Sequence, residues 1–133
     1  MKINSKVHGI IDYLSVLFLW LSPSIFSLPH TSSVFAYALG TAVLALSICT
    51  NYEYGLVKFI PLKVHGTADF VVVLASVAAA LYLESIEGEF ARNYYIGVAV
   101  VVFLIWLLSD FTNKPKETQE VPYIESNTDG AMI

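Results

Sequence analysis

Residues 64–83 read VHGTADFVVVLASVAAALYL, and this stretch decides the fold class. At about 1.5 Å per residue, a helix of this length reaches about 30 Å, which is the thickness of the hydrocarbon core of a membrane. A strand would leave its backbone groups unpaired in lipid, and the stretch lacks the alternation of polar and apolar residues seen in barrels. We therefore predict a membrane-spanning helix that carries two ionisable side chains, His65 and Asp69.

Three further stretches are apolar and of similar length, namely residues 7–28, 34–50 and 94–109. Of the 133 residues in the chain, 56% are hydrophobic and 14% are charged, whereas soluble domains average roughly 45–50% and about 25%. A small domain in water needs charged side chains to cover its surface, and this chain has too few. The sequence therefore predicts an all-α membrane protein with four transmembrane helices.

The charged and sulfur-containing residues exclude several classes of function. Seven basic and eleven acidic residues give a net charge of −4, so the chain offers no basic surface for nucleic acid. The single cysteine, Cys49, rules out an intramolecular disulfide and a CxxC redox pair. The sequence contains no GxSxG, P-loop, HExxH or dinucleotide-binding motif. We therefore expect no enzyme activity, no catalytic residues and no cofactor.

Basic residues are distributed unevenly between the two ends of the predicted helices. At one end, Arg92 is the one basic residue, in a predicted loop at 84–93. The other end has six lysines, which are Lys2, Lys6, Lys58, Lys63, Lys114 and Lys116. Because cytoplasmic segments carry the excess of basic residues, we predict a protein of the inner (plasma) membrane, embedded in its lipid bilayer, with both termini cytoplasmic. Residues 113–133 are polar and aperiodic and are expected to form a flexible cytoplasmic tail.

The chain matches itself at an offset of 57 residues. The segment KVHGIIDY at residues 6–13 aligns with KVHGTADF at residues 63–70, and the same offset aligns Gly40 with Gly97 without a gap. Each unit contains two of the predicted helices. We therefore predict two tandem helical-hairpin repeats, residues 1–55 and 56–112, related by a pseudo-two-fold axis along the membrane normal.

These motifs resemble the SPW-repeat family of small bacterial integral membrane proteins. The resemblance rests on the KVHGxxDY motif, on the Leu-Ser-Pro sequence at residues 21–23, and on a second helix that closes on TNYEYG at residues 50–55. It covers about residues 5–112. The resemblance implies an integral membrane protein with a two-helix repeat, and it implies no particular reaction.

Each predicted repeat places one histidine four residues before one aspartate. His8 and Asp12 therefore share one face of a helix, and so do His65 and Asp69. Ionisable side chains within a membrane usually face the interior of the helix bundle and find partners there. We expect each histidine to pair with its own aspartate, and the two pairs to meet as a clamp between helices, without a bound metal.

Two alternative interpretations of these four residues remain open. Imidazoles and carboxylates from two helices suit zinc, iron or manganese, although metal sites in helix bundles usually have more ligands per helix. Alternatively, the pairs could accept and release protons, which would make the protein a component of a small proton- or solute-linked transporter. The apolar remainder of the helices offers few polar groups for such a path.

Three residues are expected to shape helix packing. Gly40 and Gly97 lie in small-residue faces that let two backbones approach closely. Pro23 removes a backbone donor from the first helix and is expected to bend it, with Ser22 or Ser24 repairing the hydrogen bonding. We therefore predict a non-enzymatic, multi-pass membrane protein with a structural or interaction role, which packs its helices against a second copy in a homo-oligomer or against another membrane protein.

Overall fold

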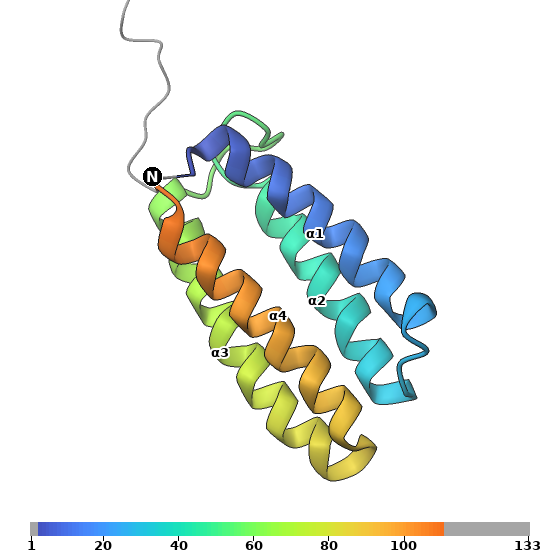
Figure 1. Cartoon of the computed structure of the whole chain (residues 1–133). Coiled ribbons are helices and arrows are strands. Elements are labelled where there is room, and N and C mark those ends of the chain that lie inside the picture. The colour runs from blue at the N-terminus through green and yellow to red at the C-terminus, as the bar shows by residue number, and fades with distance from the viewer. Residues whose placement is uncertain (1–2, 111–133) are drawn as a thin grey trace, which may run out of the picture.

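The computed structural model describes residues 3–110 and folds them into four α-helices, shown in Figure 1. The helices are α1 (Ser5–Ile25), α2 (His30–Ile48), α3 (Leu62–Glu87) and α4 (Glu89–Leu108). Each helix is long and apolar enough to cross a membrane, judged by length and composition. The prediction of an all-α chain with four helices of spanning length is confirmed for these residues. The predicted tail at 113–133 lies outside the described residues.

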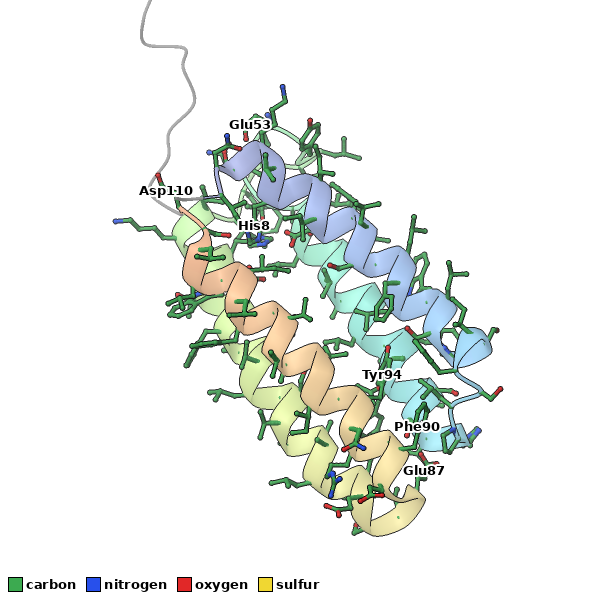
Figure 2. All side chains as sticks on the ribbon, in the orientation of Figure 1. His8, Glu53, Glu87, Phe90, Tyr94 and Asp110 are labelled. Carbon is green, nitrogen blue, oxygen red and sulfur yellow. The ribbon has the colours of Figure 1, made fainter. Side chains whose placement is uncertain are left out.

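The helices form two hairpins that stand side by side. In the first hairpin α1 packs on α2, in the second α3 packs on α4, and a smaller contact joins α2 to α3. Figure 1 shows the start of α1, the α2–α3 loop and the end of α4 together at one end of the bundle. We call this the His8 end, after the residue labelled there in Figure 2, and we call the opposite end the Gly88 end.

The turn between α3 and α4 is much shorter than the sequence predicts. The predicted loop at residues 84–93 is wrong, because α3 continues to Glu87 and α4 begins at Glu89. Gly88 alone lies between the helices, and its φ of 98° is a conformation that residues with a Cβ atom rarely adopt. Arg92 of α4 forms ion pairs with a carboxylate on each side of the turn, at 3.0 and 3.3 Å. A single glycine therefore connects the two helices of the second hairpin.

The interior of the bundle holds many polar side chains, whereas large apolar side chains cover its outer surface. Serine, threonine, histidine and aspartate side chains lie buried between the helices, together with apolar residues such as Val16 and Leu83. Large apolar side chains cover the outside, where Leu14 is 59% exposed and Leu81 is 62% exposed. An apolar surface of this extent is unfavourable in water. This distribution is typical of helices whose outer faces contact lipid.

Backbone hydrogen bonds join the helix ends at the His8 end. Ile3, before α1, donates its N–H to the carbonyl of Leu108 at 2.7 Å. Its own carbonyl accepts from the N–H of Asp110 at 2.9 Å. Ile60, before α3, makes the same pair of bonds at 2.9 and 2.8 Å, with Cys49 and Asn51 beyond α2. The start of α1 is therefore bonded to the end of α4, and the start of α3 to the end of α2.

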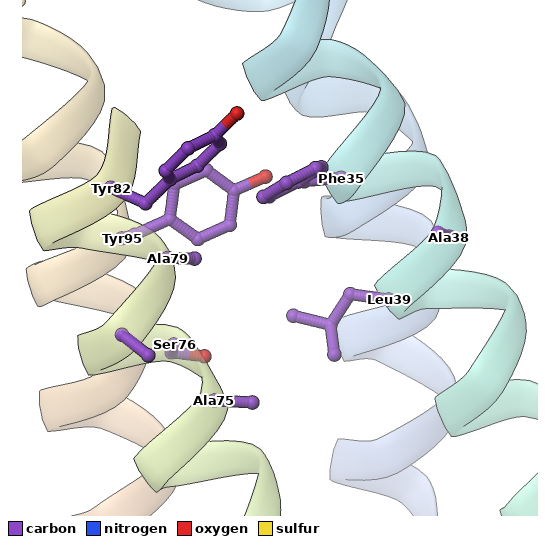
Figure 3. Close-up of a pocket in the computed structure, with 9 residues that line it drawn as sticks. Phe35, Ala38, Leu39, Ala75, Ser76, Ala79, Tyr82 and Tyr95 are labelled. Carbon is purple, nitrogen blue, oxygen red and sulfur yellow. The ribbon is translucent and has the colours of Figure 1, made fainter. Parts of the chain in front are cut away.

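A cavity of about 440 Å³ separates α2 from α3 (Figure 3). Apolar and aromatic side chains dominate its lining, and Phe35 of α2 stacks on Tyr82 of α3 with ring centroids 6.3 Å apart. Ser76 also lines the cavity, and its buried hydroxyl has no hydrogen-bond partner within the described part of the chain. The polar contacts between the hairpins lie on either side of this cavity, toward the two ends of the bundle.

Candidate functional site

The four polar residues predicted from the sequence come together between α1 and α3 at the His8 end. His8 and Asp12 lie in the first two turns of α1, and His65 and Asp69 lie in the first two turns of α3. Their side chains are between 1% and 12% exposed. The i,i+4 spacing places both residues of each pair on the face that meets the other hairpin. We call these four residues the His/Asp cluster.

The shortest contacts in the His/Asp cluster join the two hairpins. Nε2 of His8 lies 3.1 Å from Oδ2 of Asp69, and Nε2 of His65 lies 3.0 Å from Oδ2 of Asp12. The contacts within one helix are longer, at 3.3 Å in α1 and 3.6 Å in α3. Each histidine therefore lies closer to the aspartate of the other hairpin than to its own. The predicted clamp geometry is present, but its closest pairs cross between the hairpins instead of staying within each helix.

A hydroxyl group contacts the other ring nitrogen of each histidine. Nδ1 of His8 lies 2.6 Å from Oγ of Ser109 after α4, and Nδ1 of His65 lies 2.7 Å from Oγ1 of Thr50 after α2. Both hydroxyls also donate to the backbone carbonyl four residues earlier, at 2.5 Å for Ser109 and 2.6 Å for Thr50. Because a hydroxyl has one proton, each of these oxygens must accept a hydrogen bond from the imidazole. Both histidines therefore carry a hydrogen on Nδ1.

The Nε2 atoms of both histidines point into the cluster. Since Nδ1 is already a donor, Nε2 either carries a second proton or offers its lone pair to a cation. Nε2 of His65 is buried and lies 3.0 Å from a carboxylate oxygen, yet this nitrogen forms no hydrogen bond within the described residues. One ligand atom from each of the four residues lies within 4.8 Å of the other three. The His/Asp cluster therefore has the donor set for a divalent metal ion as well as for a network of ion pairs.

The α2–α3 loop packs against the His/Asp cluster. Tyr52 of this loop is 4% exposed, and its ring centroid lies 6.0 Å from that of His65. Its ring also lies against Gly9, where a Cβ atom would overlap with it. Burial, and next the negative charge of Asp12, raise the pKa of the Tyr52 hydroxyl above its ordinary value. Tyr52 therefore stays protonated beside the cluster.

A second polar contact joins the hairpins at the Gly88 end, opposite His8 in Figure 2. Glu87, the last residue of α3, accepts hydrogen bonds from the N–H groups of Thr31 at 2.7 Å and Ser32 at 2.8 Å, and from the Ser32 hydroxyl at 2.5 Å. Tyr95 of α4 donates its hydroxyl to the carbonyl of Ser32 at 2.7 Å. Pro29, which precedes α2, provides no side-chain cap. Glu87 therefore caps α2 from the other hairpin, with its negative charge at the positive end of the helix dipole.

The three predicted packing residues have different surroundings. At Gly40, a Cβ atom would lie 2.7 Å from Cδ1 of Trp20, so the missing side chain lets α1 and α2 approach closely. At Gly97, a Cβ atom would meet nothing within 4 Å among the described residues. Pro23 lies inside α1, where the Ser22 hydroxyl donates to the carbonyl four residues before it at 2.6 Å. This is not the carbonyl that Pro23 leaves without a donor, so the expected repair stays a prediction. The structure therefore places Gly40, but not Gly97, at a close helix contact.

Three polar residues that complete these contacts were not singled out by sequence reasoning. Thr50 and Ser109 follow the second and fourth helices, and Glu87 ends the third. Their one signal in the sequence is a small hydroxyl or an acidic residue at a helix end. Such residues are common at helix ends for local reasons, so this signal does not identify a partner in another hairpin.

Comparisons with protein-family models, with curated proteins and with solved structures find no match. The resemblance to the SPW-repeat family therefore stays a prediction. What can be concluded about function rests on the geometry of the His/Asp cluster and on the distribution of polar and apolar residues around it.

Proposed function

We propose that this chain is a non-enzymatic, multi-pass protein of the bacterial inner membrane, in which the His/Asp cluster clamps two helical hairpins together. The observation that carries the proposal is the reciprocal pairing across the hairpins, His8 with Asp69 at 3.1 Å and His65 with Asp12 at 3.0 Å. Each hairpin supplies one histidine and one aspartate, so each buried polar side chain has its closest partner in the other hairpin. The clamped bundle then presents its apolar outer faces to lipid, to a second copy or to another membrane protein.

The distribution of residues supports this membrane setting and its orientation. Polar side chains lie inside the bundle and apolar ones outside, which is the arrangement that lipid favours. Lys6, Lys58 and Lys63 lie at the His8 end, whereas Arg92 lies at the Gly88 end beside acidic residues. By the positive-inside rule the His8 end is cytoplasmic. Both chain termini are then cytoplasmic as well.

Corresponding buried positions support a tandem repeat, with one amendment to its alignment. Buried positions of α1 and α3 differ by 57 residues, as in His8 and His65, Asp12 and Asp69, and Val16 and Val73. Buried positions of α2 and α4 differ by 59 residues, as in Ser32 and Ala91, Ala36 and Tyr95, and Gly40 and Ala99. We infer that the second repeat has two more residues before its second helix. Gly40 then corresponds to Ala99, which explains why Gly97 has no close neighbour.

Substituting the aspartates tests the proposed role. Asp12→Asn and Asp69→Asn keep the size and an acceptor oxygen of the side chain but remove its charge. Each variant should stay folded and lose about 1 kcal/mol or less of its free energy of unfolding in detergent, because polar contacts between membrane helices are individually modest. Wild-type protein in liposomes should show no proton flux. Glu84→Gln, which removes an exposed acid at the Gly88 end, is the control and should leave the stability nearly unchanged.

A second candidate function is that of a small proton- or solute-linked transporter component. A small cavity of about 40 Å³, which Asp12 and Asp69 line together with Ser15, favours this reading. It would give the cluster an opening toward the middle of the bundle. In the liposome experiment, proton flux in the wild type that Asp69→Asn abolishes while the protein stays folded would overturn the structural role and establish this one, since an amide cannot exchange protons in the physiological range.

A further inference from the structure

We propose that the His/Asp cluster binds one divalent transition-metal ion, for which Zn²⁺ has the best-matched chemistry. His8, Asp12, His65 and Asp69 would each provide one ligand. The proposal rests on the proposed clamp, because the ion would join the same four side chains. It adds to the clamp one shared centre that binds all four. It also departs from the sequence-based expectation of a clamp without metal, on the grounds of the geometry given below.

The size of the His/Asp cluster is close to that of a coordination shell. Its four contacts between an Nε2 atom and a carboxylate oxygen measure 3.1, 3.0, 3.3 and 3.6 Å. Two atoms bound to one tetrahedral Zn²⁺ at about 2.0–2.1 Å lie about 3.3 Å apart. All the ligand atoms lie within 4.8 Å of one another, so the longest separations shorten when the ion binds. The required movements are within reach of side-chain rotation.

The surroundings of the Nε2 atom of His65 favour a shared centre. This atom is buried, in a residue that is 1% exposed, and lies 3.0 Å from Asp12. It also lies 3.6 Å from Asp69, and it forms no hydrogen bond with either carboxylate within the described residues. A buried ring nitrogen near two carboxylates and bonded to neither suits a metal ion as a shared partner, whereas an optimised ion pair would place one carboxylate on the N–H axis.

Hydrogen bonds that would orient two metal-binding histidines are already in place. Ser109 and Thr50 accept hydrogen bonds from the Nδ1 atoms of the two histidines, at 2.6 and 2.7 Å. Both hydroxyls are fixed in this acceptor role by donating to backbone carbonyls. Histidines that ligate metals almost always donate their second ring N–H in this way, which sets the tautomer and the orientation of the ring. The lone pair that remains is on Nε2, the atom that faces the cluster.

The charges of the cluster match one divalent cation. Two aspartate carboxylates balance the charge of the ion, and two imidazoles with a hydrogen on Nδ1 alone bind it as neutral ligands. A neutral assembly is what a buried position between membrane helices favours. Four protein ligands with low exposure leave no open coordination position, which is typical of structural sites and not of catalytic ones. Nitrogen and oxygen ligands in a four-coordinate site suit Zn²⁺ among the divalent ions.

Titration with Co²⁺ and Zn²⁺ tests the proposal on the full chain, purified in detergent and stripped with a chelator. We expect one equivalent of Co²⁺ to bind with the visible spectrum of a tetrahedral site, and one equivalent of Zn²⁺ to displace it and raise the unfolding temperature. His65→Gln and Asp69→Asn should lose this stoichiometric binding. Ser109→Ala leaves all four ligands in place and should weaken the apparent affinity by about 10–100-fold, as second-shell changes do.

His30→Gln is the matched control, because His30 is the one histidine of the chain outside the His/Asp cluster and lies exposed at the Gly88 end. It should bind Co²⁺ like the wild type. The proposal is overturned if folded, stripped protein binds no equivalent of either ion, or if His30→Gln loses binding while His65→Gln keeps it. If the metal-free protein retains energetic coupling between His65 and Asp12 but binds no ion, the metal proposal fails and the clamp stands. If that coupling is also absent, the clamp itself fails.

Discussion

At the scale of single residues, Glu87 makes three hydrogen bonds that cross between the hairpins. One carboxylate satisfies three hydrogen-bond donors at the start of α2, a helix that has no capping side chain of its own. Because Glu87 belongs to α3, the capping energy also contributes to the contact between the hairpins. It complements the His/Asp cluster, which joins the hairpins at the opposite end of the bundle (Figure 2).

Glu87→Gln should therefore destabilise the protein more than a comparable substitution one turn earlier. The amide keeps one acceptor oxygen but loses the charge that interacts with the helix dipole, so we expect a loss of about 1 kcal/mol in the free energy of unfolding. Glu84→Gln disrupts only an exposed ion pair with Arg92 and should change the stability by about 0.5 kcal/mol or less. Chemical unfolding of both variants in the same detergent measures the difference, and equal losses would contradict the capping role.

The chemistry of the His/Asp cluster could be predicted from the sequence, but its pairing could not. The i,i+4 spacing of His8 and Asp12 indicates a shared helix face, and burial of an aspartate within a membrane helix demands a partner. Which partner is closer depends on the distance and rotation between α1 and α3, and those depend on packing along the entire length of the hairpins. The roles of Ser109 and Thr50 could not be predicted for the same reason. Each contacts a histidine that is distant in the sequence and close only in the folded chain.

At the scale of helices, the apolar spans could be located from composition, whereas their ends depend on local details. The polar residues at 84–93 suggest a loop, yet Gly88 allows a turn of one residue. The charged residues on either side of Gly88 then belong to helices, with their side chains at least partly exposed on the helix surfaces. In the proposed repeat, the two extra residues before the second helix have a related reason. A long α3 followed by a one-residue turn replaces a shorter α1 followed by a four-residue connection.

The two mid-helix glycines give a prediction at this scale. Alanine is the better helix former, so Gly97→Ala should be neutral or stabilise the protein by up to about 1 kcal/mol, since its Cβ atom meets nothing. Gly40→Ala gains the same propensity, but its Cβ atom would press on Trp20 and on Leu19 of α1. We expect Gly40→Ala to be less stable than Gly97→Ala by about 1–3 kcal/mol, the usual cost of overpacking.

Thermal unfolding in detergent compares the two alanine variants under identical conditions. If Gly40→Ala were as stable as Gly97→Ala, then α1 and α2 would not depend on this close approach. In the amended repeat, Gly40 corresponds to Ala99, which already has a Cβ atom. The comparison therefore also measures whether the first hairpin tolerates the Cβ atom that the second hairpin has at this position.

At the scale of the whole molecule, two hairpins are joined by polar contacts at both ends, and an open pocket of about 440 Å³ lies between α2 and α3 (Figure 3). The number of helices in the described chain and their approximate positions follow from hydropathy, but this arrangement does not. It depends on contacts between residues that are more than 50 positions apart, such as Ser32 with Glu87 and His8 with Asp69. Periodicity within one helix carries no information about them.

The orientation of the whole molecule can be checked by labelling single cysteines in a Cys49→Ser background. Ser85→Cys lies on an exposed position near the Gly88 end, and Val57→Cys lies on an exposed position of the α2–α3 loop. Because Lys6, Lys58 and Lys63 lie at the His8 end, a membrane-impermeant maleimide added to intact cells should label position 85 and not position 57. Labelling of position 57 in intact cells would contradict the predicted orientation, and permeabilised cells provide the control that both cysteines can react.

A double-mutant cycle between His65 and Asp12 tests the central claim, that buried pairs across the hairpins hold the bundle together. The free energy of unfolding is measured in detergent and chelator for the wild type, His65→Gln, Asp12→Asn and the double variant. A clamp predicts a coupling energy between about 0.6 kcal/mol, the average for polar contacts between membrane helices, and about 1.7 kcal/mol, their maximum. Asp12→Asn combined with Glu87→Gln, at the opposite end, should be additive within about 0.3–0.5 kcal/mol. Additivity of His65→Gln and Asp12→Asn to the same precision would contradict the account.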